Sequence, residues 1–285
     1  MSLDGLFLVD KPEGPSSFGV LRSLRPALGR KLGHAGTLDP FASGLLLVLA
    51  GAATRLANYL VGLDKAYRAE VQFGAISTTL DPEGEITPAG GVVDEAAVRE
   101  AAAGLSGRIL QRVPAASAVR VDGQRAYARM RRGEAVEPAP REVTIERLEV
   151  EAFDAEAQRA VIFVRCSKGT YVRQIAADMG ERAGGGAYCA ALRRLETGGF
   201  SVEAAGTPGQ ILERPDGPWR LSPAAAVGHL PGRVLEPAEV EDVRHGRPLA
   251  LEGEQGPTRL LDGEELAAVA EPREGVLRPV LVLTR

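Results

Sequence analysis

The segment Tyr67–Phe73 alternates between two kinds of side chain, and this regular period constrains the fold more tightly than any other stretch of the chain. Successive side chains of a β-strand point to opposite faces, so a period of two predicts a strand with one buried and one polar face. The polar face carries Arg68, Glu70 and Gln72. The apolar face, which we expect in a core, carries Tyr67, Ala69, Val71 and Phe73.

Further strands and three helices are expected along the first two thirds of the chain. Apolar, β-prone runs predict strands at 5–11, 45–49, 143–151 and 160–166. Ser16 or Ser17 can cap one helix, Asp94 a second and Thr170 a third, because their side-chain oxygens accept hydrogen bonds from free first-turn amides. On one side of the first helix we expect Phe18, Leu21 and Leu24. On one side of the third helix we expect Val172, Ile175, Ala176 and Met179.

The C-terminal part has the pattern of a separate unit. Residues 201–232 are rich in Gly, Pro and Ala, which is typical of a connection. Short β-prone pieces such as 259–261 and 276–284 then lie between turns. We therefore expect one domain over 1–230 and a small β domain over 231–285.

Composition narrows the class of protein. With 45% hydrophobic and 25% charged residues, the 285-residue chain can bury a core unaided. Cys166, Cys189 and only three histidines offer no metal cluster, and such sparse cysteine suits a reducing cytosol, although a disulfide stays open. The acidic N-terminus is no signal peptide, and the run Leu45–Ala50 is far shorter than the roughly 20 residues of a membrane helix. We expect a soluble, cytoplasmic protein.

Positive charge is concentrated in one segment although the net charge is −4. Residues 108–132 contain seven arginines and one acid, whereas Leu230 to the end contains seven arginines and eleven acids. Because a solvated helix face alternates its signs, this segregation favours an anion-binding arm, inserted at about 108–142. Arginine binds phosphate and stacks on bases, and the candidates are Arg120, Arg125, Arg129 and Arg132.

A glycine-rich loop carries the first candidate for chemistry. In Gly33–Pro40, two glycines allow close backbone approach, and Pro40 biases Asp39 toward an extended conformation. A carboxylate held this way can act as a nucleophile toward a sugar carbon. The alternative is an aspartate that merely caps a turn.

A strand-to-helix junction at 165–173 carries the second candidate. Arg173 lies at the start of the helix, where it could pair with a loop carboxylate or phosphate, or simply be a surface arginine. Cys166 could be a nucleophile, but a thiol at a strand end more often packs. Tyr67 is either a core residue or a ring that stacks on a flipped base. His34 is either a satisfied loop histidine or an aromatic plane inserted into an RNA stack.

These segments together resemble the bacterial tRNA pseudouridine synthases of the TruB type, which act on a T-loop uridine. The resemblance runs almost end to end and in order. It covers LVDKPEG at 8–14, Ser16-Ser17, the loop 33–40 with Gly44, DKAYR at 64–68, TLDPEG at 79–84, Cys166–Arg173, and LRRL at 192–195. One such motif could arise by chance, but several in order are specific.

The resemblance implies roles for single residues. Asp39 matches the catalytic aspartate, Tyr67 the tyrosine that stacks on the target base, and Arg173 the arginine that pairs with the aspartate. Leu192 and Tyr171 match two residues that line the pocket. His34 matches a residue that fills the place of the extruded nucleotide, and Lys11 matches a support near the site.

The resemblance also implies a fold and partners. We expect an α+β fold with a mixed, mainly antiparallel sheet flanked by helices, and a C-terminal β-barrel of the PUA type. The substrate would be uridine at position 55 of tRNA, held by its T-arm and acceptor stem, with no protein partner, a monomeric enzyme, and no membrane. The segment 113–120 departs from the family: it lacks an aromatic residue near Ala116 and has Arg120 where lysine is common. This departure leaves the fine contacts of the arm in question.

Isomerising uridine to pseudouridine moves the glycosidic bond from N1 to C5 and imports no group, so the reaction requires neither cofactor nor metal. The target must first be flipped out of folded RNA, at a cost of a few kcal/mol. Attack of Asp39 at C1′ and removal of a ribose proton both start from one carboxylate, and the sequence leaves both open. The rival hypotheses are an RNA-binding or tRNA-folding module without turnover, a glycoside hydrolase, which needs two carboxyls, and a guide-dependent relative.

Overall fold

The computed structural model describes residues 3–116, 120–121, 124–125 and 138–283. A ten-stranded sheet runs through the larger part of the chain, and only the pairing of β12 with β3 is parallel. The α+β prediction of a mixed, mainly antiparallel sheet is therefore confirmed. The strands, in sheet order, are β14 (Arg220–Leu221), β1 (Gly5–Lys11), β3 (Ser43–Ala50), β12 (Ala187–Thr197), β4 (Lys65–Phe73), β11 (Arg159–Cys166), β10 (Arg141–Asp154) and β7 (Gly107–Gln111), with β2 (Leu32–Ala35) beside β3 and β13 (Phe200–Ser201) beside β12.

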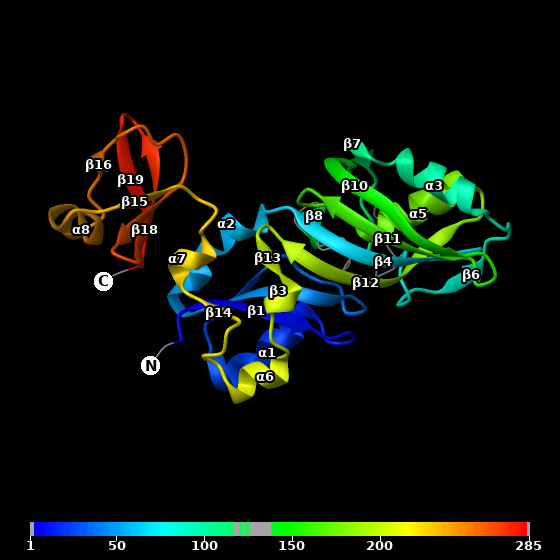
Figure 1. Ribbon diagram of the computed structural model, residues 1–285, viewed down its shortest axis with the longest axis horizontal. Helices are drawn as coiled ribbons and strands as arrows, with labels where there is room; N and C mark the ends of the chain where they lie inside the picture. Colours follow the sequence, from blue (N-terminus) through cyan, green and yellow to red (C-terminus); the bar gives the residue numbers. More distant parts are fainter. Residues whose placement is uncertain (1–2, 117–119, 122–123, 126–137, 284–285) are drawn as a thin grey trace.

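Helices pack on this sheet around two apolar cores. Figure 1 shows α5 and α3 together near β10 and β11, and α1 with α6 near β1. The described helical segments are α1 (Ser17–Leu28), α2 (Ala57–Val61), α3 (Glu95–Ala103), α5 (Val172–Ala183), α6 (Pro208–Glu213), α7 (Pro223–Ala226), and the 3₁₀ turns η1 (Gly51–Leu56) and η2 (Val202–Ala204). None of the described helices combines the length and apolar character that crossing a bilayer requires.

The strand predictions agree with the burial of the strands. The predicted core face of β4 is buried throughout, from Tyr67 to Phe73, while Arg68 on the other face is exposed. The apolar run 45–49 is the centre of β3 and is inaccessible to solvent. β3 is buried on both faces because apolar layers cover both sides of the sheet here, one in each core, whereas the apolar face of β4 belongs to the first core alone.

Two of the three predicted helix caps are present. Ser16 accepts a hydrogen bond from the amide of Gly19 at 3.0 Å, and Asp94 caps α3 in the same way. Thr170 is not a cap, because its hydroxyl donates to the carbonyl of Ser167 at 2.9 Å. Of the three side chains expected on one side of α1, Leu21 and Leu24 are buried, whereas Phe18 is 53% exposed.

The expected arm begins and ends within the main sheet. Its first residues form β7, which pairs with the start of β10 through the register of Gln111 with Arg141. The part outside the sheet is therefore 112–140, where a small pairing joins β8 (Arg120–Val121) to β9 (Gln124–Arg125). Arg129 and Arg132 lie outside the described residues. A second small pairing joins β5 (Ala75–Ser77) to β6 (Ile86–Pro88).

The C-terminal segment forms a five-stranded sheet with its own apolar core. Figure 1 shows this sheet to one side of the main sheet, with α7 between them. Leu266, Val269 and Leu281 pack into a core of the larger unit, and the guanidinium of Arg55 donates to the carbonyl of Val282 at 2.6 Å. Its elements are β15 (Gly232–Val234), α8 (Pro237–Arg244), β16 (Leu249–Ala250), β17 (Thr258–Asp262), β18 (Glu265–Arg273) and β19 (Val276–Val282).

Candidate active site

Asp39 lies in the loop between β2 and β3, and its two neighbours in the chain are held in place from outside the loop. The hydroxyl of Ser17 accepts from the amide of Leu38 and donates to its carbonyl, both at 2.9 Å. The carbonyl of Pro40 accepts from Nζ of Lys11 at 3.1 Å and from the amide of Gly14. The backbone of this loop is therefore fixed on both sides of the carboxylate.

Glycines permit the close packing of this loop against β12. Gly36 has a φ of 84° and Gly44 a φ of 100°, a region that L side chains rarely adopt. A Cβ atom at Gly44 would lie 2.2 Å from the carbonyl oxygen of Arg194. The backbones of β3 and β12 meet here, at the one parallel pairing of the main sheet.

Arg173 stands between two carboxylates. Its Nε lies 3.2 Å from Oδ2 of Asp39, and its Nη1 lies 2.6 Å from Oδ2 of Asp81. The arginine is 4% exposed and Asp81 is 1% exposed, while the side chain of Asp39 is 38% exposed. The angle at Nε is not that of a hydrogen bond, so the contact with Asp39 is an ion pair. Asp39 is thus the open end of a buried charge network.

The remaining donors of the guanidinium bind backbone carbonyls. Nη1 also donates to Thr79 at 3.1 Å, and Nη2 donates to Ala116 at 2.9 Å. Asp81 is also held on several sides, since its Oδ1 accepts from the hydroxyl of Thr79 at 2.6 Å and from the amide of Glu83 at 3.0 Å. Groups held by several hydrogen bonds have little freedom to rotate.

Two opposing effects act on Asp39. Burial raises the pKa of this carboxyl above its ordinary value, whereas the charge of Arg173 lowers it. Asp81 adds a smaller increase and Lys11 a smaller decrease in the pKa. Burial in turn lowers the pKa of Lys11 to about 8, against the opposing charge of Asp39. The ionised form of Asp39 therefore depends on its cationic neighbours.

A cavity of about 680 Å³ opens over this network. It brings together Asp39 and Arg173 with three of the other predicted residues, Tyr67, Tyr171 and Leu192. Tyr67 is 8% exposed and Leu192 is 7% exposed, so both are core residues whose edges reach the cavity. The cations at the cavity wall, besides Arg173, are Lys65, Arg141, Lys168 and Arg194.

Two predicted residues are not part of the cavity wall. Lys11 is fully buried beneath the loop and donates to the carbonyls of Pro12 and Pro40, which agrees with a supporting position. His34 lies on β2, and burial with the nearby charge of Arg194 lowers the pKa of its imidazole. Its Nδ1 is buried and has no hydrogen-bond partner among the described residues.

Three residues with clear positions in the site were not singled out from the sequence: Asp81, Arg194 and Lys65. Arg194 is 1% exposed and donates from Nε to the carbonyl of Leu45 and from Nη2 to that of Gly36, at 2.6 and 3.0 Å. The period of two could have identified it, because Leu192 and Arg194 share one face of β12.

Lys65 opens the strand that carries Tyr67. Its Nζ donates to the carbonyls of Val61 and Leu63, and burial lowers the pKa of this amine to about 8. Arg141, at the start of β10, stacks its guanidinium 5.1 Å from the ring centre of Tyr171. An arginine next to an aromatic ring offers both charge and a flat surface to a nucleotide.

The cysteines take no part in this site. Both are free and buried, and the predicted alternative of a disulfide is wrong. Burial raises the pKa of the Cys166 thiol to about 11 and that of Cys189 further still, so neither forms a thiolate readily. Within the described ranges, no group of three or more His, Cys, Asp or Glu side chains is arranged around a common metal position.

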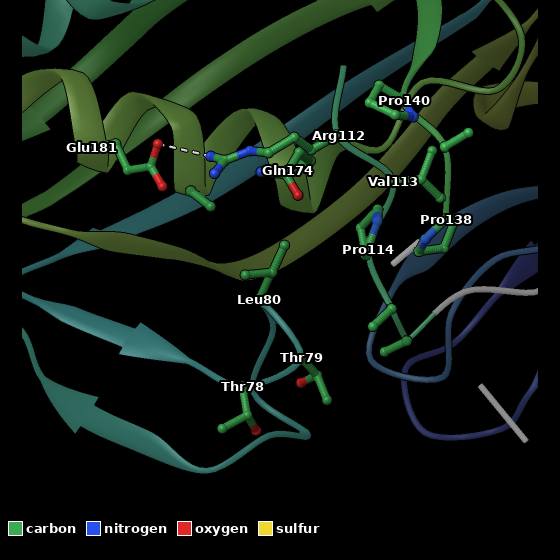
Figure 2. A pocket seen from close by; sticks show the side chains of 14 residues that line it. Thr78, Thr79, Leu80, Arg112, Val113, Pro114, Pro138, Pro140, Gln174 and Glu181 are labelled. Carbon is green, nitrogen blue, oxygen red and sulfur yellow. Dashed lines mark hydrogen bonds and ion pairs between the residues drawn. The ribbon is translucent and has the colours of Figure 1, made fainter. Parts of the chain in front are cut away.

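A second cavity, of about 460 Å³, lies where the two ends of the segment 112–140 meet. Figure 2 shows Val113 and Pro114 near Pro138 and Pro140, with Thr79 and Leu80 elsewhere on the wall. Arg112 reaches α5, where it pairs with Asp178 and Glu181, both at 2.7 Å. The base of the arm is therefore tied to the helix that carries Arg173.

Comparison with known proteins agrees with this geometry. Residues 25–172, just over half of the chain, match the family model described as TruB family pseudouridylate synthase (N terminal domain). The chain is 42% identical to tRNA pseudouridine synthase B of Thermobifida fusca (strain YX), covering 98% of both chains. It is 39% identical to the same-named protein of Arthrobacter sp. (strain FB24), covering 98% of this chain and 96% of that one.

Solved structures share the fold. A Cbf5-Nop10-Gar1 complex contains a chain that matches 99% of this one with a TM-score of 0.76 at 23% identity, over 85% of its own length. An H/ACA RNP bound to a substrate RNA containing 2′-deoxyuridine gives 0.76 at 22% identity, over 100% of this chain and 86% of that one. The likeness to these structures shows the fold, while the matching family model and the two sequence relatives show that the chain belongs to the TruB family of pseudouridylate synthases and is an isomerase.

Proposed function

We propose that this enzyme converts uridine to pseudouridine in the T-loop of tRNA, at position 55, with Asp39 as the catalytic residue. The observation that carries the proposal is the single cavity that gathers Asp39, Arg173, Tyr67 and Leu192. The relatives named tRNA pseudouridine synthase B, at about 40% identity over nearly the whole chain, support tRNA as the substrate.

The target nucleotide enters this cavity only after it has left the RNA stack. Unstacking costs a few kcal/mol, and stacking on the ring of Tyr67 returns about 1–3 kcal/mol. Leu192 and Tyr171 lie on the same wall and would pack against the base and ribose. His34 would fill the space that the nucleotide leaves in the loop.

Asp39 then acts on the ribose of the flipped nucleotide. Arg173 keeps the carboxylate ionised in a partly desolvated place, since an adjacent opposite charge favours the charged form. Lys11 fixes the loop through the carbonyl of Pro40. Attack at C1′ gives a covalent adduct, and proton removal at C2′ gives a glycal, so a trapped adduct or an isotope effect at C2′ distinguishes the routes.

Rejoining the ribose to C5 forms the new glycosidic bond. C5 must then lose its proton and N1 must gain one, and Tyr67 is the proposed aid to the loss at C5 because it lines the same cavity as Asp39. No atom is gained or lost over the whole reaction, so we propose catalysis without a metal or organic cofactor.

The other parts of the chain would hold the tRNA. We propose that the arm 112–140 contacts the T-arm through Arg120, Arg125, Arg129 and Arg132. We also propose that the five-stranded C-terminal sheet is a PUA-like domain on the acceptor stem. We further propose that the enzyme is a monomer and acts on its tRNA substrate in the cytoplasm.

Position-resolved mapping of pseudouridine tests this proposal. Purified enzyme is incubated with unmodified tRNA transcript, and pseudouridine is mapped along the product. We expect a single new pseudouridine, at position 55. Modification of other positions would contradict the proposed target, release of free uracil would indicate a hydrolase, and unaltered tRNA that still binds would indicate a module without turnover.

A further inference from the structure

We propose that the outer face of α1, together with the short turn that follows it, is a second RNA-binding surface, which grips the phosphate backbone of the tRNA beside the flipped nucleotide. The inference rests on the proposed function, because the RNA that it would hold is the enzyme's own substrate. The surface, called here the α1 basic face, consists of Phe18, Arg22, Arg25, Arg30 and Lys31.

A one-signed stretch of sequence forms this face. Between Glu13 and Asp39 the chain has four cations and no acidic residue, although its net charge is −4. The sequence pattern pointed to the arginine-rich segment 108–132 as the RNA-binding surface, because that segment has more cations. The α1 basic face also carries charge of one sign, and all four of its cations are exposed.

Three of its residues form a stripe along the helix. Phe18, Arg22 and Arg25 are four and three residues apart, a spacing that brings side chains onto one face of a helix. The guanidinium carbons of Arg22 and Arg25 lie 5.5 and 5.8 Å from the ring centre of Phe18. Both cations therefore lie against one exposed aromatic ring.

The cations of this face have no acidic partners within the part of the chain that the structure describes. No carboxylate of the described residues lies within ion-pair distance of any of the four. Exposed arginines of the main sheet differ: Arg147 pairs with Glu149 at 2.6 Å, and Arg159 pairs with Glu70 at 3.2 Å. The positive charges of these two sheet arginines are therefore paired with carboxylates, whereas those of the α1 basic face are available to bind an external polyanion.

The α1 basic face borders the catalytic loop directly. Ser17 binds Leu38 through two hydrogen bonds, so the residues next to Phe18 and Asp39 are in contact. Arg30 and Lys31 immediately precede β2, the strand that leads into the same loop. A nucleotide in the Asp39 cavity thus has its backbone next to this face.

The arm and the α1 basic face reach the site by different routes. The base of the arm contacts Arg173 through Ala116, whereas α1 contacts Leu38. Figure 1 shows α1 near β1, whereas the arm begins after β7, which lies at the other end of the main sheet. With both surfaces engaged, the RNA is held on two flanks of the extruded nucleotide, which resists the return of the base to the stack.

Binding measurements on paired variants test this inference. Arg22→Gln/Arg25→Gln and Arg30→Gln/Lys31→Gln are made in an Asp39→Asn background, and the Kd for unmodified tRNA transcript is measured at several salt concentrations. We expect each pair to weaken binding about tenfold at low salt and to reduce the slope of log K against log salt by about one to two. The matched control is Arg147→Gln/Arg159→Gln, two exposed arginines that already have acidic partners, with unchanged Kd and slope.

Unchanged affinity and salt slope in both α1 pairs would overturn the inference. Weaker binding with an unchanged slope, or a loss equal to that of the control pair, would also count against it. In the active enzyme the same pairs should raise KM for tRNA and leave kcat within about twofold. Since Kd is measured without turnover, failure of the wild-type enzyme to form pseudouridine would sink the proposed function and leave this test intact.

Discussion

Nη1 of Arg173 lies 2.6 Å from Oδ2 of Asp81, closer than Nε of the same arginine lies to Asp39, at 3.2 Å. Asp81 is buried and is not among the residues that line the site cavity. A carboxylate behind the cavity therefore fixes the guanidinium, and Asp39 is its looser and more exposed partner. The arrangement lets Asp39 be charged and still be free to meet a ribose, as the proposed reaction requires.

The substitution Asp81→Asn tests this support. It keeps the shape of the side chain but leaves Arg173 without its shortest ion pair, and breaking a buried pair costs about 3–5 kcal/mol. We expect a lower Tm and a fall in kcat of about 100-fold, the effect of a misplaced catalytic group. Single-turnover rates and thermal melting measure both. The control is Glu83→Gln, an exposed neighbour, and wild-type kcat with wild-type Tm in Asp81→Asn would refute the idea.

The pH dependence of the rate should follow Asp39. The active form is the carboxylate, so the rate falls as pH falls through the pKa of this group. Asp81 raises the pKa of Asp39, so Asp81→Asn removes a negative charge and lowers that pKa. The acid limb of the rate profile should therefore move to lower pH, although the maximal rate is reduced. Single-turnover rates at saturating enzyme measure this limb, and a shift to higher pH would contradict the assignment.

Two substitutions of Tyr67 separate stacking from proton transfer. Tyr67→Phe keeps the ring and removes the hydroxyl, so we expect nearly unchanged tRNA affinity and a much reduced kcat. Tyr67→Leu also loses the stacking platform, which is worth about 1–3 kcal/mol per base. Affinity for tRNA should then fall about 10- to 100-fold relative to Tyr67→Phe. Equal affinities of the two variants would show that the ring does not stack on the base.

The arginines of the arm should set part of the salt dependence of binding. Replacing Arg125, Arg129 and Arg132 with glutamine is expected to weaken tRNA binding and to reduce the salt slope by about two to three, because each phosphate contact releases counterions. Titrations at several salt concentrations measure this. A slope equal to that of the wild type would mean that these side chains do not contact phosphate.

Most elements of the fold were predictable from local patterns. The alternation over 67–73 and the apolar run 45–49 report directly on burial, because strand side chains have only two directions. The position of Phe18 was not predictable in this way. The spacing of Phe18 with Leu21 and Leu24 fits a helix, but the apolar stripe that is buried is centred on Leu21 and Leu24, and Phe18 lies at its edge. Nor was the capping role of Thr170 right, since the turn Ser167–Thr170 uses the hydroxyl locally.

The site was predictable in its main residues but not in its support. The order of the sequence motifs predicted that Asp39, Tyr67 and Arg173 belong to one site. Asp81 and Arg194 depend on contacts between segments about 90 to 160 residues apart, to Arg173 in the first case and to Gly36 and Leu45 in the second. The period of two puts Arg194 on the same face of its strand as Leu192, but it does not give the partners of either residue. An aspartate in a turn-like segment and an arginine in a strand both resemble surface residues until the chain is folded.

The central claim is that one carboxylate, Asp39, performs the isomerisation, and the substitution Asp39→Asn tests it most directly. The measurement pairs pseudouridine formation at position 55 with the Kd for the same tRNA. We predict no detectable pseudouridine and a Kd within about threefold of the wild type, while the control Asp10→Asn, which alters a partly exposed ion pair with Arg193, stays active. Pseudouridine formation by Asp39→Asn at the wild-type rate would contradict the account.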